Sequence, residues 1–330
     1  MTNTNINKFH QEDFTNILKM IKKSQISALK SVNTELIDLY WNIGKFIHQR
    51  VEKSNWGGQS VVKQLADYLK KADPSLKGFS RQNLWRMKQF YETYKDHQKL
   101  SALLREITWT NNVAIFSRCK TIDEREFYIY QSKKEKWSSR ELDRQISSSL
   151  YERMMISNNK ISSKLKEVYP KSASYFKDDY VFEFLDLEDH SENQLQKALI
   201  KNLKKFILEL GRDFLFVGKE YRIQVGGNND FYIDLLFFNR ELQCLVAFEL
   251  KTDKFKPEHL GQLNFYLEAL DRDVKKEQEN PSIGILLCRD KDDTVVEYAI
   301  SRSLSPSMVS QYRTKLPDKK LLKEKLNQIL

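Results

Sequence analysis

The chain has 330 residues, of which 40% are hydrophobic, enough for two domains with buried cores rather than a disordered segment. Lys and Arg number 55 against 45 Asp and Glu, and the net charge of +10 favours a polyanionic partner without identifying one. No stretch approaches the roughly 18 apolar residues that cross a bilayer, and residues 1–30 are polar, so we expect neither export nor a membrane segment. Three widely spaced cysteines predict no disulfide framework and favour a reducing cytoplasm.

The first half of the chain combines helical patterning with most of the basic excess. Residues 1–170 hold 30 Lys and Arg against 18 Asp and Glu, whereas the remaining 160 residues hold 25 against 27. From Phe14 to about Arg153, apolar residues recur mainly at the spacing of one helix face. We therefore predict an all-helical, basic N-terminal domain over residues 1–156. Turn-forming residues then cluster in a linker over 157–178, and a second domain follows over 179–330.

A short motif in the helical half resembles the turn and second helix of a helix-turn-helix. Gly78 precedes a predicted helix that begins with Arg81, Gln82 and Asn83 and continues with Arg86. Side chains of these types make bidentate contacts with base edges, so the four are candidate nucleic-acid-binding residues. A capped amphipathic helix with a solvated outer face is the alternative.

The second half alternates strands with helices. We predict a helix over 192–210, strands over 214–225, 232–238 and 244–250, a helix over 257–270 and a strand over 283–288. A turn at 226–229 and a corner at 239–240 join the three consecutive strands. This order predicts a domain of the α+β or α/β class, with a mixed sheet flanked by helices.

Two neighbouring strands of this domain carry charges within apolar runs. Asp234 lies near the centre of the apolar run 231–238, where an unpaired carboxylate is costly. Glu249 and Lys251 end the next strand, and the period of two places them on one face. If the strands pair, Asp234 lies beside Glu249, and two such carboxylates suit a hard cation such as Mg²⁺. The alternatives are a solvated ion pair between Glu249 and Lys251 and a satisfied core carboxylate at Asp234.

Residues 231–238, 244–251, 255–263 and 281–288 together resemble the YhcG-like nucleases of the PD-(D/E)XK superfamily. Residues 78–80, 126–128 and 137–142 resemble that family's helical N-terminal domain, so the resemblance covers nearly the whole chain. It implies a restriction-endonuclease-like domain in which Asp234 and Glu249 hold Mg²⁺, or Mn²⁺ in its place, and Lys251 orients or activates the attacking water. Ile233 stands where the superfamily motif has proline, a position that touches no metal ligand. The implied activity is metal-dependent hydrolysis of phosphodiester bonds, as an endonuclease acting on DNA in defence or DNA processing.

The resemblance adds further candidate site residues. Gln262 and Tyr266, four residues apart on the predicted helix, match a Gln-x-x-x-Tyr pattern of many superfamily members, which makes Gln262 a candidate catalytic residue and Tyr266 an additional one. Glu192 matches a place where such folds supply another acidic group, and Glu220 is a further candidate. An ordinary polar helix face would also explain Gln262 and Tyr266, and a dipole-compatible glutamate would explain Glu192.

Two other interpretations of the chain remain open. In the first, the fold binds nucleic acid or a partner protein, and its nuclease site is silent or waits for that partner. In the second, the helical half is a homo-oligomerisation domain that lets two nuclease sites act on two strands. The presence of all three of Asp234, Glu249 and Lys251 argues against a decayed site.

Overall fold

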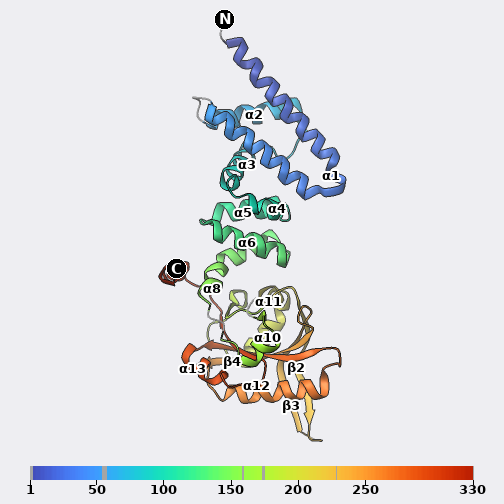
Figure 1. Ribbon diagram of the computed structural model, residues 1–330, viewed down its shortest axis with the longest axis vertical. Coiled ribbons are helices and arrows are strands. Elements are labelled where there is room, and N and C mark those ends of the chain that lie inside the picture. The colour runs from blue at the N-terminus through green and yellow to red at the C-terminus, as the bar shows by residue number, and fades with distance from the viewer. Residues whose placement is uncertain (1–2, 54–57, 158–159, 173–174, 228, 330) are drawn as a thin grey trace. The chain divides into compact units, whose positions relative to one another are not determined.

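The computed structural model describes residues 3–53, 58–157, 160–172, 175–227 and 229–329 (Figure 1). Its contacts divide the chain into two compact units, Met1–Ile146 and Ser147–Leu330. Within the described part of the chain, no helix is long and apolar enough to cross a membrane.

The first unit is helical where it is described. Its helices are α1 (Asn3–Lys53), α2 (Gly58–Ala72), α3 (Arg81–Tyr94), α4 (Ser101–Leu104), α5 (Trp109–Arg118), α6 (Ile122–Glu135) and α7 (Ser139–Ser147). Leu84 and Met87 of α3 join a core with Ile43 and Ile47 of α1. A Cβ at Gly44 would collide with the backbone carbonyl of Met87, so glycine permits this close crossing of α1 and α3.

The second unit is built on a six-stranded mixed sheet. Its strands are β1 (Asp179–Val181), β2 (Phe214–Val225), β3 (Asn229–Asn239), β4 (Cys244–Lys254), β5 (Asn280–Asp290) and β6 (Ser307–Arg313). Its helices are α8 (Leu150–Ile156), α9 (Ser163–Val168), α10 (Glu192–Lys201), α11 (Leu203–Leu210), α12 (His259–Ala269), α13 (Asp293–Ile300) and α14 (Lys319–Ile329). The strand order is β1-β6-β5-β4-β3-β2. The β2–β3 and β3–β4 pairs are antiparallel, and the other pairs are parallel.

Each face of the sheet packs against its own helices. Leu195 of α10 and Phe206 of α11 bury against one face in a cluster that includes Phe248 of β4. Leu263 and Leu267 of α12 bury against residues of the other face. Because helices cover both faces, the central strands are mostly apolar, and a charged side chain in them is poorly solvated.

The boundary between the units differs from the predicted one. The division falls after Ile146, ten residues before the end of the predicted domain at residue 156, because α8 belongs to the second unit. Arg153 of α8 donates to the backbone oxygen of Asp179 in β1. The predicted linker 157–178 contains α9, and Ile161 forms a β-bridge with Met308 of β6. Residues 158–159 and 173–174 of that linker lie outside the described residues.

Several element predictions also need correction. The predicted helix 192–210 is two helices, because α10 ends at Asn202, whose backbone leaves the helical conformation. The strands predicted at 232–238 and 283–288 are longer, as β3 and β5, and β1, β6, α13 and α14 were not predicted. Of the turn predicted at 226–229, Asn228 lies outside the described residues, and Gly226 and Gly227 adopt positive φ angles of 66° and 88°.

Candidate active site

The antiparallel pairing of β3 with β4 brings Asp234 beside Glu249. Paired residues run from Asn239 opposite Cys244 to Leu235 opposite Phe248, so the next residue on each strand is one of the two carboxylates. At this point the backbone N–H of Leu250 donates a 2.8 Å hydrogen bond to Asp234 Oδ2, so a side-chain oxygen of Asp234 takes the place of a backbone acceptor. The pairing of β3 with β4 and this hydrogen bond together fix the position of Asp234.

Glu249 is a buried carboxylate with one unsatisfied oxygen. Glu249 is only 2% exposed, and its Oε2 has no hydrogen-bond partner among the described residues. Burial and the nearby Asp234 raise the pKa of Glu249 to about 7. Burial also raises the pKa of Asp234, against the opposing effect of the Leu250 N–H. The raised pKa values of both carboxyls indicate that too little positive charge surrounds them.

Lys251 supplies part of that charge. Its Nζ lies 3.0 Å from Glu249 Oε1 and 3.3 Å from Glu192 Oε2 at the start of α10. Burial alone would lower the pKa of Lys251, but Glu249 and Glu192 raise it overall, so the ammonium stays charged. Glu192 begins α10 behind a capping box formed by Ser191 and Gln194, which fixes the start of that helix.

A hollow of about 590 Å³ opens beside Asp234. Its described lining comes from α10, β2 and β3: Glu192, Asn193, Gln196, Lys219, Glu220, Tyr232 and Asp234. Glu220 of β2 has a positive φ of 45°. It lies between Lys219 and Tyr221, which pair with Leu235 and Ile233 of β3, so Glu220 is opposite Asp234. A left-handed conformation is unfavourable for glutamate, and such strain persists only where surrounding structure holds it.

Gln262 and Tyr266 lie on α12 and contact each other. Gln262 Nε2 donates to the Tyr266 hydroxyl at 2.6 Å, and the tyrosine ring is buried while Gln262 is exposed. Burial raises the pKa of Tyr266, the Gln262 bond opposes this, and Glu249 and Asp234 raise it further. The hydroxyl is therefore within electrostatic range of both carboxylates.

The residues present fit a divalent cation held by two protein ligands. Among the described residues no group of three or more His, Cys, Asp and Glu side chains is arranged to hold a metal ion. Mg²⁺ seldom needs such a cage, because it is commonly bound by one or two carboxylates with water and substrate phosphate completing the octahedron. The unpartnered Glu249 Oε2 and the raised pKa of Glu249 are the observations that a cation beside Asp234 would resolve.

Comparison with known proteins assigns the chain to a family. Residues 173–327 match the model of the YhcG PDDEXK nuclease domain, and residues 16–153 match the DUF1016 N-terminal domain. An Escherichia coli (strain K12) protein named "Putative nuclease YhcG" is 31% identical in an alignment 357 positions long. The alignment covers 96% of this chain and 93% of that protein. The chain belongs to the YhcG family of nucleases. The predicted fold class, a helical region followed by a nuclease domain with a mixed sheet, is thereby confirmed.

Two solved structures are similar to part of this YhcG-family chain. One is a crystal structure of a repair endonuclease from Pyrococcus abyssi, with 16% identity and a TM-score of 0.26, and the other is EndoMS in its apo form, with 20% identity and a TM-score of 0.24. Each match covers 40% of this chain. The matched region spans about half of each solved chain, 50% and 49% respectively.

The structure places the sequence-predicted residues in three groups. Asp234, Glu249, Lys251 and Glu192 are in contact or adjacent, and Glu220 lines the same hollow. Gln262 and Tyr266 form a pair on α12. Arg81, Gln82, Asn83 and Arg86 lie on α3 of the other unit.

The sequence did not point to every residue of the hollow. Gln196 is buried and donates its Nε2 to the backbone oxygen of Asp234 at 3.1 Å. Lys219 and Tyr232 contribute to the lining from β2 and β3. The available signal was the spacing of Gln196, one helical turn after Glu192, but its contact with β3 depends on packing across the unit.

Proposed function

We propose that this chain is a divalent-metal-dependent nuclease that hydrolyses phosphodiester bonds of DNA at Asp234, Glu249 and Lys251. The observation that carries the proposal is the buried Glu249, whose Oε2 is unsatisfied among the described residues, beside the half-buried Asp234, with the pKa of both carboxyls raised. A buried carboxylate normally has its oxygens satisfied, so this pair is stable only with a cation or a proton. Membership of a nuclease family supports the cation.

Each residue has a role in this account. Asp234 and Glu249 would hold Mg²⁺, which Mn²⁺ would replace, and when bound such an ion supplies Lewis acidity and lowers the pKa of its water. Lys251, held by Glu249 and Glu192, orients the attacking water and neutralises negative charge as the phosphorane forms. We assign Glu192 to positioning Lys251. Gln262 and Tyr266 orient substrate at the α12 side of the site.

The charge distribution favours a nucleic acid as the substrate, and we take DNA as the one to test first. The first 170 residues carry an excess of 12 basic over acidic side chains, and this excess suits a long polyanion rather than a small phosphate ester. Glu192, Glu220 and Asp234 give the hollow near the site an acidic lining, so the basic residues that attract substrate lie elsewhere on the chain. The nuclease unit therefore supplies the chemistry, and the helical unit supplies binding.

The test is a cleavage assay on plasmid, linear, branched and single-stranded DNA and on RNA, with Mg²⁺, Mn²⁺ or EDTA. Wild type should cut DNA with either metal and not in EDTA. Asp234→Ala, Glu249→Ala and Lys251→Ala should each lower the rate by at least about 100-fold, the usual cost of losing one group that stabilises charge in a transition state.

Two matched variants serve as controls. Asp230→Asn removes an exposed carboxylate from the same strand as Asp234, where it pairs with Arg222. Lys254→Ala removes an exposed ammonium from the same strand as Lys251. Both should cut like wild type. Cleavage that persists at the wild-type rate in Asp234→Ala would refute the proposed site.

A further inference from the structure

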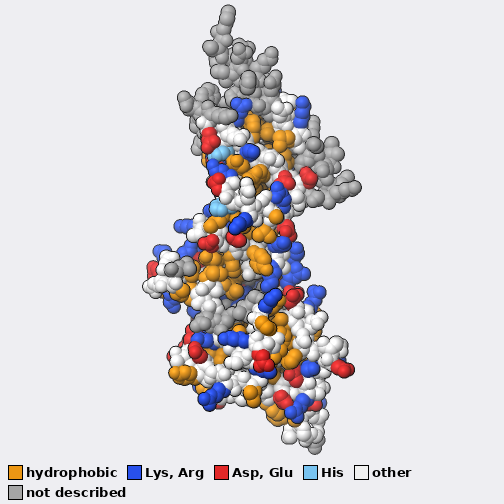
Figure 2. Space-filling model, viewed as in Figure 1, with side chains coloured by type: hydrophobic (Ala, Val, Ile, Leu, Met, Phe, Trp, Pro, Cys, Tyr) orange, Lys and Arg blue, Asp and Glu red, His pale blue; other side chains and the backbone are white. Residues whose placement is uncertain are grey.

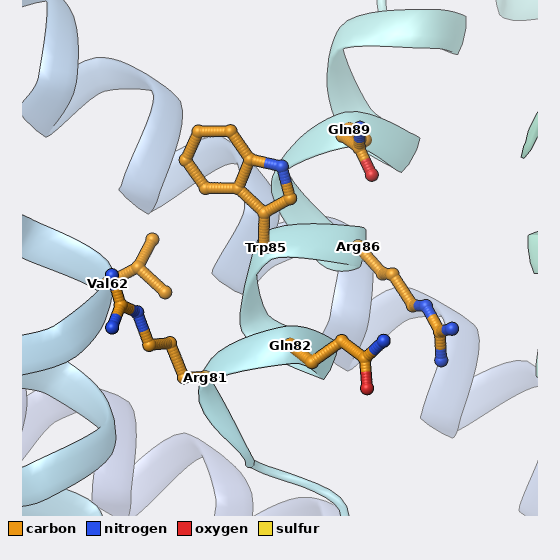
Figure 3. Close-up of a pocket in the computed structure, with 6 residues that line it drawn as sticks. All are labelled: Val62, Arg81, Gln82, Trp85, Arg86 and Gln89. Carbon is orange, nitrogen blue, oxygen red and sulfur yellow. The ribbon is translucent and has the colours of Figure 1, made fainter. Parts of the chain in front are cut away.

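The outer face of α3 combines cations, amides and an aromatic ring around one hollow. The hollow measures about 530 Å³ and is lined, among the described residues, by Val62 of α2 and by Arg81, Gln82, Trp85, Arg86 and Gln89 of α3 (Figure 3). In Figure 3 the Arg81 side chain extends toward Val62, whereas Gln82 and Arg86 extend on the other side of Trp85. The lining residues of α3 recur at spacings of one, three and four, so they form one helical face.

This face is separate from the face that holds the unit together. The buried apolar positions of α3 include Leu84, Met87 and Phe90, and the first two belong to the core shared with α1. Arg81, Gln82 and Gln89 are exposed, and Trp85 and Arg86 are partly exposed. One side of α3 therefore packs in the core of the unit, and the other side is exposed to solvent.

Asn83, which the sequence grouped with Arg81 and Gln82, has a different role. Its Nδ2 donates to the backbone oxygen of Gly78, and its Oδ1 accepts from Trp109 Nε1 at 2.9 Å. Both ends of the amide are thus used within the unit. Gly78 has a φ of 90°, a conformation that favours glycine, so Asn83 stabilises the turn that orients the start of α3.

The charge on this face is not neutralised by nearby acids. Residues 58–95 contain eight Lys and Arg and three Asp and Glu. Among the described residues, Arg81 and Arg86 form no ion pair, whereas Lys88 on the same helix pairs with Glu92 at 2.6 Å. Figure 2 shows Lys and Arg side chains interspersed with hydrophobic ones on the visible face of the helical unit. Unpaired guanidinium groups are suited to phosphate, which they bind bidentately.

We propose that the hollow between α2 and α3 binds nucleic acid through an unpaired base, which stacks on Trp85 while Arg81 and Arg86 contact the flanking phosphates. Val62 and Trp85 provide an apolar surface on which a base can lie. The volume of the hollow is within the range of small-ligand pockets. Gln82 and Gln89 carry both a donor and an acceptor, as base edges require. A base held in this way must be unstacked from its own strand, so the favoured ligand is single-stranded DNA or a duplex with an unpaired segment.

The experiment measures binding by the full-length chain in EDTA, so that cleavage does not intervene. Fluorescence anisotropy is recorded with labelled single-stranded DNA, with a fully paired duplex, and with the same duplex carrying a central unpaired segment. Trp85→Ala should weaken binding of the first and third by about 10-fold, as expected for loss of one stacked base, and should leave the paired duplex nearly unchanged.

Trp85 also packs against the core of its unit, so further variants are needed. Trp85→Phe keeps an aromatic ring and should bind within about twofold of wild type. Arg81→Gln with Arg86→Gln should weaken all three DNAs and reduce the dependence of log Kd on log salt by about one for each arginine. Arg140→Gln, which removes an exposed arginine of α7 outside the hollow, is the matched control and should bind like wild type.

The outcomes separate this inference from the proposed nuclease activity. Equal binding of the unpaired segment by wild type, folded Trp85→Ala and the double arginine variant would overturn the inference, even if the protein cuts DNA. Equal losses for paired and unpaired DNA in Trp85→Ala would overturn the stacked base. Displacement of DNA by an acidic peptide whose own binding needs Trp85 would assign the hollow to a protein partner instead. Trp85-dependent binding in EDTA, together with no cleavage of any substrate in the Mg²⁺ and Mn²⁺ assay, would leave the inference standing and refute the proposed nuclease activity.

Discussion

Glu209 of α11 and Glu249 of β4 are both buried carboxylates of the nuclease unit, but their surroundings differ. Glu209 is fully buried, with Lys177 Nζ at 3.3 Å, Arg153 at 3.6 Å and the backbone N–H of Val181 at 3.2 Å from Oε1. Lys251 Nζ pairs with Oε1 of Glu249, whereas Oε2 has no hydrogen-bond partner among the described residues. Asp234 is a second negative charge close to Glu249. The charge of Glu209 is compensated by two cations and a hydrogen bond, whereas the charge of Glu249 beside Asp234 is compensated only in part and would be balanced by a metal ion.

An unpaired oxygen alone does not mark a functional carboxylate. Glu152 of α8 is buried, and within the described part of the chain neither of its carboxylate oxygens has a hydrogen-bond partner. Two lysines of α14, Lys319 and Lys323, lie 3.7 and 3.8 Å from its Oε1. The feature that distinguishes Glu249 is the second carboxylate beside it, because two negative charges in a poorly solvated place require a cation.

The largest effect on stability is expected at Glu209. Glu209→Gln leaves the buried side chains of Arg153 and Lys177 with less compensating charge, and breaking a buried ion pair costs about 3–5 kcal/mol. Urea unfolding measures this loss. Glu188→Gln, which breaks the exposed pair with Lys315, is the control and should cost less than about 1 kcal/mol. Equal stability of the two variants would remove the contrast between Glu209 and a surface glutamate.

The opposite sign is expected at Glu249. Glu249→Gln removes a buried negative charge next to Asp234 and should raise the free energy of unfolding in EDTA at pH 8 by about 1–3 kcal/mol. The pKa of Glu249 is raised from 4.5 to about 7 in the fold, so wild type should lose this stability as pH rises through that interval. The Glu249→Gln variant should lack that loss. A variant less stable than wild type at pH 8 without metal would contradict the account.

A smaller effect is expected at Glu220, where the cost lies in the backbone. Glu220→Gly relieves a left-handed conformation with a φ of 45° and should stabilise the protein by about 1 kcal/mol. Glu220→Ala is the matched variant, because it removes the same carboxylate but keeps the strain. If both variants unfold at the same urea concentration, the conformation at Glu220 is not strained.

The sequence predicted which central residues of the candidate site lie together better than it predicted the contacts around them. Asp234, Glu249 and Lys251 could be predicted because the period of two and a short hairpin place them together with little help from the rest of the fold. The contact of Glu192 with Lys251 depends on where α10 packs, and local patterning does not encode that. Similarly, Asn83 matched a base-reading residue in type, but its partner Trp109 is 26 residues away in sequence.

Parts of the fold were missed for related reasons. β1 has three residues, too few to show any periodicity, and it is a strand only because it pairs with β6. α8 continues the helical pattern of the first half, so its place in the second unit is set by the buried Arg153 and its partner Glu209. In both cases contacts between distant residues decide the structure, and composition does not.

The most direct test of the central claim compares Glu249→Gln with Glu209→Gln in a Mg²⁺-dependent DNA cleavage assay, with rates expressed per folded molecule. We expect Glu249→Gln to be fully folded and to cut at least about 100-fold more slowly than wild type. Glu209→Gln should be less stable but should cut at the wild-type rate where it is folded. Wild-type cleavage by Glu249→Gln would contradict the assignment of the catalytic site.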